Sequence, residues 1–97
     1  MAAVARLGDS VSTNHGCSPT TTIASASSDV FIDGIGAATV GDVTAVHQYT
    51  GRHCEVPHVY TLSSGSGTVF VDGKALLRVG DGGSETVSAG SGTVSAG

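Results

Sequence analysis

The sequence predicts a small all-β protein built from three pseudo-equivalent β-hairpin repeats, with no significant helix. The phrase V-F-I-D-G at residues 30–34 recurs as V-F-V-D-G at residues 69–73, and each copy runs on to Val-Gly-Asp, at residues 40–42 and 79–81. Glycine and β-branched residues are frequent and aromatic residues make up only 4%, which is typical of strands and tight turns around a thin core. No window shows apolar residues at helical spacing. A phrase repeated at fixed internal spacing indicates one supersecondary unit used several times.

Each full repeat is expected to form a β-hairpin. The apolar runs at residues 30–32 and 69–71 are both followed by Asp-Gly, the strongest short hairpin signal, and then by a return strand. Each repeat then closes on a Gly-Asp turn, in which the Asp side chain caps its own backbone. These turns are predicted at residues 8–9, 41–42 and 80–81.

The two ends of the chain carry complementary halves of the repeat. Residues 6–9 match the closing half, and residues 91–94 match the opening half. If the termini pair, the chain closes into three hairpins and loses an exposed edge, so residues 1–97 are expected to form a single domain. The loops between the repeats cover roughly residues 10–27, 43–66 and 82–91.

Charge and hydropathy argue against several classes of function. Four Lys and Arg stand against eight Asp and Glu, for a net charge of −4. Few cations are therefore present to neutralise phosphate, and no nucleic-acid partner is expected. No apolar stretch approaches the ~20 residues that span a bilayer, and the N-terminus lacks the charged-then-apolar pattern of a signal peptide. We expect a protein made in the cytoplasm that leaves the cell, if at all, by another route.

All four histidines and both cysteines fall in the first two loops, outside the predicted hairpins. They are His15, Cys17, His47, His53, Cys54 and His58. Imidazole and thiolate are preferred ligands of Zn²⁺, and a structural zinc site takes four protein ligands. A metal would stabilise so thin a core, because its binding energy adds to the folding energy. We rank His15, Cys54 and His58 first as metal ligands, with His47 and His53 competing for the fourth position.

Other interpretations of these residues stay open. The histidines are solvated loop side chains in one of them. In another, Cys17 and Cys54 form a disulfide, which requires an oxidising compartment. A third makes one cysteine a nucleophile beside a histidine, but nothing marks the base and the orienting residue that such chemistry needs. We therefore assign no catalytic residue and expect neither an enzyme nor a small-molecule substrate.

Over nearly its full length the chain resembles the PAAR-repeat family. The family signature is Pro-Ala-Ala-Arg-x-Gly-Asp, preceded by a Ser-x-x-Val-Phe-x-Asn-Gly hairpin. The matching stretches here are A-V-A-R-L-G-D at residues 3–9, G-A-A-T-V-G-D at residues 36–42 and A-L-L-R-V-G-D at residues 75–81. The prolines of the motif are missing, and Asp replaces Asn in both hairpin phrases.

The resemblance implies a small pointed β cone that caps the trimeric β-helical spike of a contractile injection machine, either a phage tail or a type VI secretion system. One monomer would sit on one trimer and sharpen it for piercing a target cell envelope. The protein would then be found at a virion tail tip or be secreted extracellularly by the machine. The alternatives are an adaptor that carries effector cargo on the spike and a small zinc or thiol hydrolase.

The resemblance also implies a metal near the apex, usually zinc with iron as the alternative, held by three His and one Cys. His15 matches the family's ligand in the first loop, and His58 with His47 or His53 matches those of the second. The family commonly places its Cys in the third loop, where this chain reads G-G-S-E at residues 82–85. Cys54 is therefore expected to substitute.

Two further expectations concern the outside of the cone. Ile35, Leu76 and Leu77 are candidates for the face toward the spike, although inward packing is the favoured alternative. Because the chain begins at the first motif and ends at the last, we expect a bare tip without a fused toxin.

Overall fold

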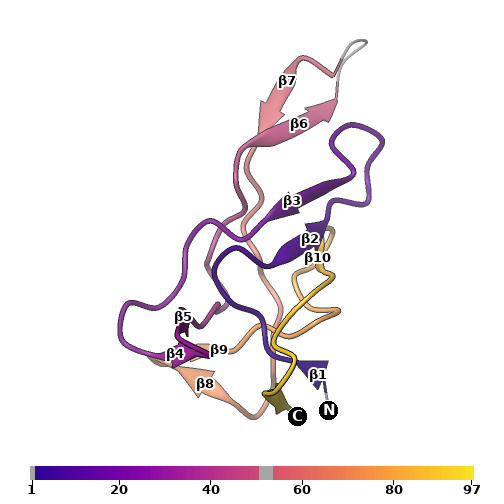
Figure 1. Cartoon of the computed structure of the whole chain (residues 1–97). Coiled ribbons are helices and arrows are strands. Elements are labelled where there is room, and N and C mark those ends of the chain that lie inside the picture. The colour runs from indigo at the N-terminus through magenta and orange to yellow at the C-terminus, as the bar shows by residue number, and fades with distance from the viewer. Residues whose placement is uncertain (1, 51–53) are drawn as a thin grey trace.

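The computed structural model describes residues 2–50 and 54–97, and every regular element in these ranges is a β-strand. The strands are short and pair in small antiparallel sheets (Figure 1). They are β1 (Ala2–Ala3), β2 (Ser10–Ser12), β3 (Thr20–Thr22), β4 (Phe31–Ile32), β5 (Ile35–Gly36), β6 (His47–Thr50), β7 (Val56–His58), β8 (Phe70–Val71), β9 (Lys74–Ala75), β10 (Thr86–Val87) and β11 (Ser95–Ala96). The prediction of an all-β protein is confirmed. Nowhere in the described ranges is there a helix of the length and hydropathy needed to cross a membrane.

The two complete repeats form hairpins with the predicted turns. β4 and β5 pair across Asp33 and Gly34, and β8 and β9 pair across Asp72 and Gly73. Both residues of each turn have positive φ, at 56° and 79° in the first and 54° and 76° in the second. This is the type I′ geometry, whose twist matches that of the flanking strands and which Asp-Gly adopts readily.

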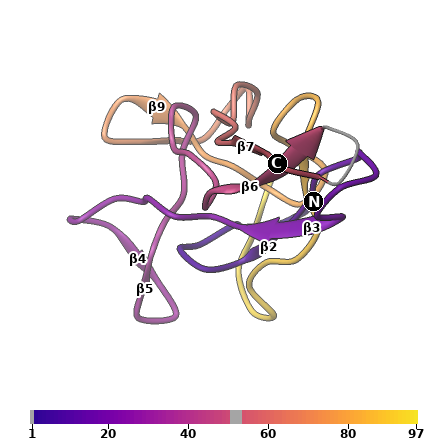
Figure 2. The ribbon, with the colours of Figure 1, turned by 90° about the horizontal axis from the view of Figure 1, so that it is seen from above.

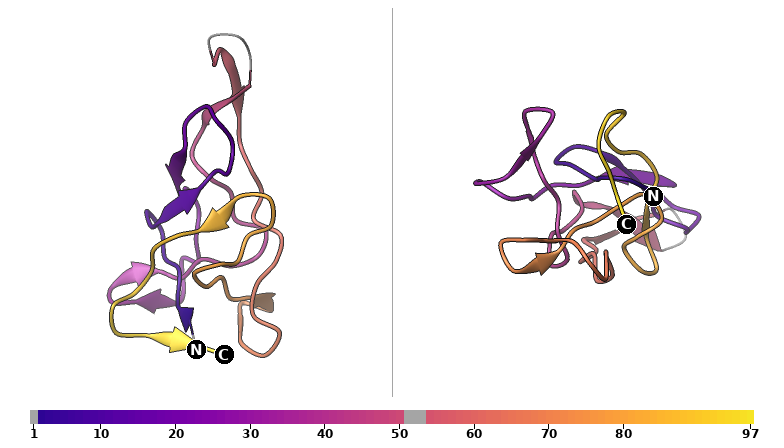
Figure 3. Two further views of the ribbon diagram at one scale, coloured as in Figure 1. Left: turned by 90° about the vertical axis from the view of Figure 1, so that its right-hand side faces the viewer. Right: turned by 90° about the horizontal axis from the view of Figure 1, so that it is seen from below.

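The chain termini pair with each other, as the split repeat predicted. β1 lies antiparallel to β11, with Ala2 opposite Ala96 and Ala3 opposite Ser95. The backbone N–H of Val4 donates to the carbonyl of Val94 at 3.0 Å and continues this pairing. Both termini therefore lie at the same end of the molecule (Figures 1 and 3).

The three repeat segments meet in a closed ring of backbone hydrogen bonds. Ala5 donates to Leu77, Leu77 donates to Ala38, and Ala38 donates to Ala5, at 2.9–3.0 Å. These three residues are fully buried and belong to the main apolar cluster. The cluster also contains Val11, Ile23, Leu62 and Val87.

The three Gly-Asp turns use the same hydrogen bond. In each turn an Asp carboxylate accepts from the backbone N–H three residues earlier, at 2.7–2.9 Å. The donors and acceptors are Arg6 and Asp9, Thr39 and Asp42, and Arg78 and Asp81. The three aspartates are therefore turn formers, as predicted.

The molecule is elongated and tapers toward one end. Its principal extents are 40, 24 and 21 Å. The sheets β1–β11, β4–β5 and β8–β9 lie at the broad end, and the hairpin β6–β7 forms the narrow end (Figure 1). Viewed along the long axis, the broad-end hairpins project outward around the centre (Figures 2 and 3).

The apolar residues divide between the core and the broad end. Leu76 and Leu77 are 3% and 0% exposed, so they pack inward and are not available to a partner, whereas Ile35 is 36% exposed. The largest exposed apolar side chains of the hairpins are those of Phe31 and Phe70, at 57% and 59%. The two phenylalanines hold equivalent positions in β4 and β8. The sequence predicted that they lie in strands but did not predict that they are exposed.

Asp33 joins the first hairpin to the C-terminal segment. Its carboxylate accepts hydrogen bonds from the hydroxyls of Ser91 and Thr93, at 2.5 and 2.6 Å, and from Arg6 at 3.1 Å. The Ser91 and Thr93 hydroxyls, followed by the Arg6 charge, hold the pKa of Asp33 below its ordinary value.

We expect Asp33→Asn to lower the melting temperature at neutral pH. A carboxyl whose pKa is depressed on folding contributes stability above its unfolded pKa of about 3.9, and this contribution is lost as the pH falls through the lower folded value. The difference between the variant and the wild-type protein should therefore shrink in acid. Thermal melts at neutral pH and near pH 3 test this, and an equal difference at both pH values contradicts the assigned role.

Candidate metal centre

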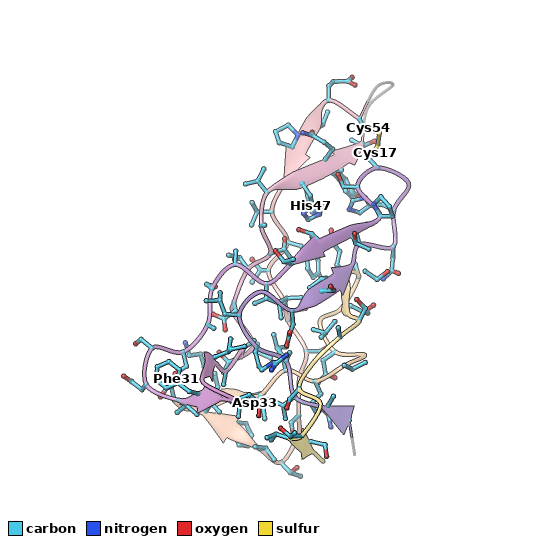
Figure 4. The ribbon with its side chains drawn as sticks, in the orientation of Figure 1. Cys17, Phe31, Asp33, His47 and Cys54 are labelled. Carbon is cyan, nitrogen blue, oxygen red and sulfur yellow. A yellow bond between two sulfur atoms is a disulfide. The ribbon has the colours of Figure 1, made fainter. Side chains whose placement is uncertain are left out.

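Four side chains converge from three loops near the narrow end. They are His15, His47, His58 and Glu85, and their nearest ligand atoms all lie within 4.8 Å of one another. Figure 4 shows His47 inside the upper part of the molecule, below the Cys17–Cys54 disulfide. The cluster therefore lies at the end opposite the broad-end hairpins.

Strand pairing explains why these residues meet. His47 begins β6 and His58 ends β7, and the two are directly opposite each other in the ladder. β10 pairs with β2, so Glu85, just before β10, comes beside the loop that follows β2 and carries His15. Residues 70 apart in the sequence are thereby brought into contact.

The three imidazoles converge on one carboxylate oxygen. The Nε2 atoms of His15 and His47 lie 3.0 Å from Glu85 Oε2, and that of His58 lies 2.6 Å from it. The side chains of His47 and Glu85 are 3% and 2% exposed. The site is therefore largely removed from water on the His47 side.

Backbone carbonyls set the tautomer of two of the histidines. His15 donates from Nδ1 to the carbonyl of Cys17 at 2.6 Å, and His47 donates from Nδ1 to the carbonyl of Ala45 at 2.9 Å. In a neutral imidazole this leaves Nε2 as a lone-pair acceptor. Histidines that ligate metals are commonly oriented in this way by a second hydrogen bond.

This arrangement fits a metal cation. Two imidazole lone pairs that face a carboxylate oxygen at 3.0 Å repel it unless a cation lies among them. Zinc bonds of 2.0–2.2 Å in a tetrahedron put ligand atoms about 3.4 Å apart, so a small outward shift from the observed contacts makes room for the ion.

The direction of the pKa shift of Glu85 favours its ionised form. Burial raises the pKa of Glu85, but the close contacts of its carboxylate with the His47, His58 and His15 rings together outweigh burial, so the net pKa lies below the ordinary value. Glu85 Oε1 is buried and has no hydrogen-bond partner among the described residues. One oxygen of this carboxylate is thus left for a further interaction.

The cysteines lie just beyond the cluster, joined to each other. Cys17 and Cys54 form a disulfide across a sequence separation of 37 residues. The disulfide interpretation is therefore the one that the structure contains. Cys54 was predicted as a metal ligand, and this is corrected: its sulfur is bonded to that of Cys17 and offers no thiolate. The same bond removes the thiol nucleophile of the hydrolase alternative.

Of the other predicted ligands, the structure brings three together and does not describe the fourth. His15, His47 and His58 are brought together as described above, whereas His53 lies outside the described residues. Sequence reasoning missed Glu85. A signal was present, because the related family places a ligand in the third loop and Glu85 is the residue of that loop with a metal-binding side chain. Carboxylate oxygen is an ordinary zinc ligand.

Comparison with protein families gives the class of the chain. The family model described as PAAR motif matches residues 13–84, about three quarters of the sequence. The chain therefore belongs to the PAAR-motif family, a family of structural proteins, and this membership is consistent with a spike-tip protein of contractile injection systems. No curated protein matches the chain.

Proposed function

We propose that this protein is a metal-stabilised cone that caps the trimeric β-helical spike of a contractile injection machine, one monomer per trimer. It would be made in the cytoplasm, carried out on the spike of a phage tail or type VI secretion system, and driven into a target cell envelope. The observation that carries the proposal is the division of the molecule into two ends. The donor cluster and disulfide lie toward the narrow end, and the hairpins with exposed phenylalanines lie at the broad end.

The narrow end is suited to resist local unfolding. His15, the His47–His58 pair and Glu85 come from three separate loops, so an ion held by all four would tie the loops together. Zinc or ferrous iron suits this set of imidazoles and one carboxylate. Bound metal would add its binding free energy to the stability of a tip whose large apolar side chains, such as Val46, Tyr49 and Val56, are exposed and not packed in a core.

The broad end is suited to a partner with threefold symmetry. Equivalent hairpins offer related surfaces to related chains, and their exposed strand backbones could pair with the last strands of the spike. Phe31 and Phe70 add apolar side chains at the same place in two of these hairpins. The third hairpin has Ser95 in the corresponding position, so the three contacts would be unequal.

The test is binding to a trimeric β-helical spike protein, sought among the products of the neighbouring genes, with the stoichiometry measured by native mass spectrometry. We expect one chain per trimer. Phe31→Asp combined with Phe70→Asp should weaken binding at least about 100-fold, because buried aromatic anchors supply roughly 2 kcal/mol or more each. The control is Val46→Asp, which places one such charge on a 68% exposed side chain beside β6, away from the broad end. Equal binding by both variants would contradict docking through the broad end.

A further inference from the structure

The candidate metal centre is open on one side. A cavity of about 240 Å³ is lined by three of the four candidate ligands, His15, His58 and Glu85, but not by His47. The side chains of His15 and His58 are 15% and 22% exposed, against 3% for His47. The cluster is therefore sealed toward the core and accessible from the cavity.

The charge inside this cavity favours an anion. A divalent ion with three neutral imidazoles and one carboxylate keeps about one net positive charge, and a bound ion dominates the local field. The other side chains that line the cavity are all uncharged. They are Thr13, Asn14, Tyr49, Tyr60 and Ser84. Among the described lining residues, Glu85 is thus the one anion, and it is already committed to the cluster.

The size and polarity of the cavity limit the ligand to a small one. At roughly 30 Å³ per water, the cavity has room for about eight waters, enough for an anion of a few heavy atoms. Because three of the four candidate ligands line the cavity, an ion held by them would face it, and a small ligand in the cavity could join the ion as a fifth donor.

We propose that this cavity binds a small anion with a nitrogen or oxygen donor atom, such as azide or acetate, as an exchangeable ligand of the metal. The proposal rests on the metal site of the proposed function and adds to it. The tip would carry a reactive cation with one accessible face, in place of a fully enclosed structural ion.

Cobalt(II) loading tests the proposal, because the visible absorption of cobalt reports the number and kind of its ligands. Azide titrated into the cobalt-loaded full chain should produce a saturable spectral change, with cobalt retained after buffer exchange. Ser84→Phe replaces an exposed residue that lines the cavity with a bulky one that should fill it, and should weaken the azide response at least about tenfold. Ser28→Phe makes the same change at an exposed serine far from the cluster and should respond like the wild-type protein.

The possible results separate this inference from the proposed function. If the protein takes up no cobalt or zinc, the metal part of the proposed function fails and this inference with it. If cobalt binds but its spectrum ignores azide, the site is closed and only this inference is overturned. An equal azide response in Ser84→Phe, or removal of cobalt by azide, also overturns it.

Discussion

Chelation of the metal-loaded protein is expected to lower its melting temperature by about 20 °C. A ligand present at about 1,000 times its dissociation constant stabilises the folded state by about 4 kcal/mol, and 1 kcal/mol corresponds to roughly 4–8 °C for a domain of this size. The effect is large because the metal would join His15, His47, His58 and Glu85 from separate loops around a small core. Elemental analysis of the purified protein, followed by melts with and without chelator, measures it.

Glu85→Gln makes this prediction specific to the cluster. The substitution keeps the shape of the side chain and removes its charge, so metal affinity should fall by more than the roughly 10–100-fold that changes around the ligands cost. Asp29→Asn is the matched control, because it removes the same charge from an exposed residue beside β4. Unchanged affinity in Glu85→Gln, or a melt insensitive to chelator, would show that Glu85 or the metal has been wrongly assigned.

Reduction of the Cys17–Cys54 disulfide is expected to destabilise the metal-free protein by about 4 kcal/mol. The bond spans 37 residues in the sequence, and this figure follows from the loop-closure entropy that such a link removes from the unfolded chain. Cys17→Ser combined with Cys54→Ser should behave like the reduced wild-type protein. Urea unfolding of both, with and without reductant, gives the free energies.

The same reduction should cost less when metal is bound. With His15 and His58 on one ion, the disulfide closes only residues 15–17 and 54–58, a loop of about eight residues, which lowers the entropic contribution to about 2.5 kcal/mol. The disulfide and the metal are thus partly redundant constraints on the same two loops. Equal destabilisation in the metal-free and metal-loaded protein would mean that the ion does not bridge these loops.

Much of the fold could be predicted because its signals are local. A two-residue hairpin turn requires positive φ at both of its residues, and Asp-Gly adopts this conformation readily. The dipeptides Asp33-Gly34 and Asp72-Gly73 were therefore enough to predict the two hairpins. The Gly-Asp turns are equally local, since each carboxylate caps a backbone N–H three residues away. The pairing of the termini is long-range, but the complementary halves of the repeat made it visible.

The ligand set was predicted less completely. Histidines are few in this chain, so His15, His47 and His58 stood out by composition. Glu85 is one of eight acidic residues, and its place in the third loop, where the related family has a ligand, is the sequence signal that sets it apart. Its role depends on the pairing of β10 with β2, which buries it beside a loop 70 residues away.

Cys54 shows why adjacency in the sequence is a weak guide to a site. It follows His53 and lies four residues before His58, so spacing favoured it as a ligand. In the folded chain its sulfur bonds to Cys17, on the far side of the cluster from the core (Figure 4). From the sequence, Cys54 was assigned either to a disulfide or to a metal site. The disulfide and the donor cluster are both present in the structure, because Glu85 and not Cys54 is the fourth donor of the cluster.

The sequence by itself determined the repeated hairpins, the turns and the clustering of histidine and cysteine in two loops, because each depends on residue type and on contacts between near neighbours. Only the tertiary structure decided which side chains point inward together. In the folded chain Leu76 and Leu77 are buried, and Phe31 and Phe70 are exposed. Cys54 is in a disulfide, and Glu85 is the fourth member of the donor cluster. The direction of a side chain depends on strand register and on packing across the whole chain, and a shift of one residue in register turns it to the opposite face.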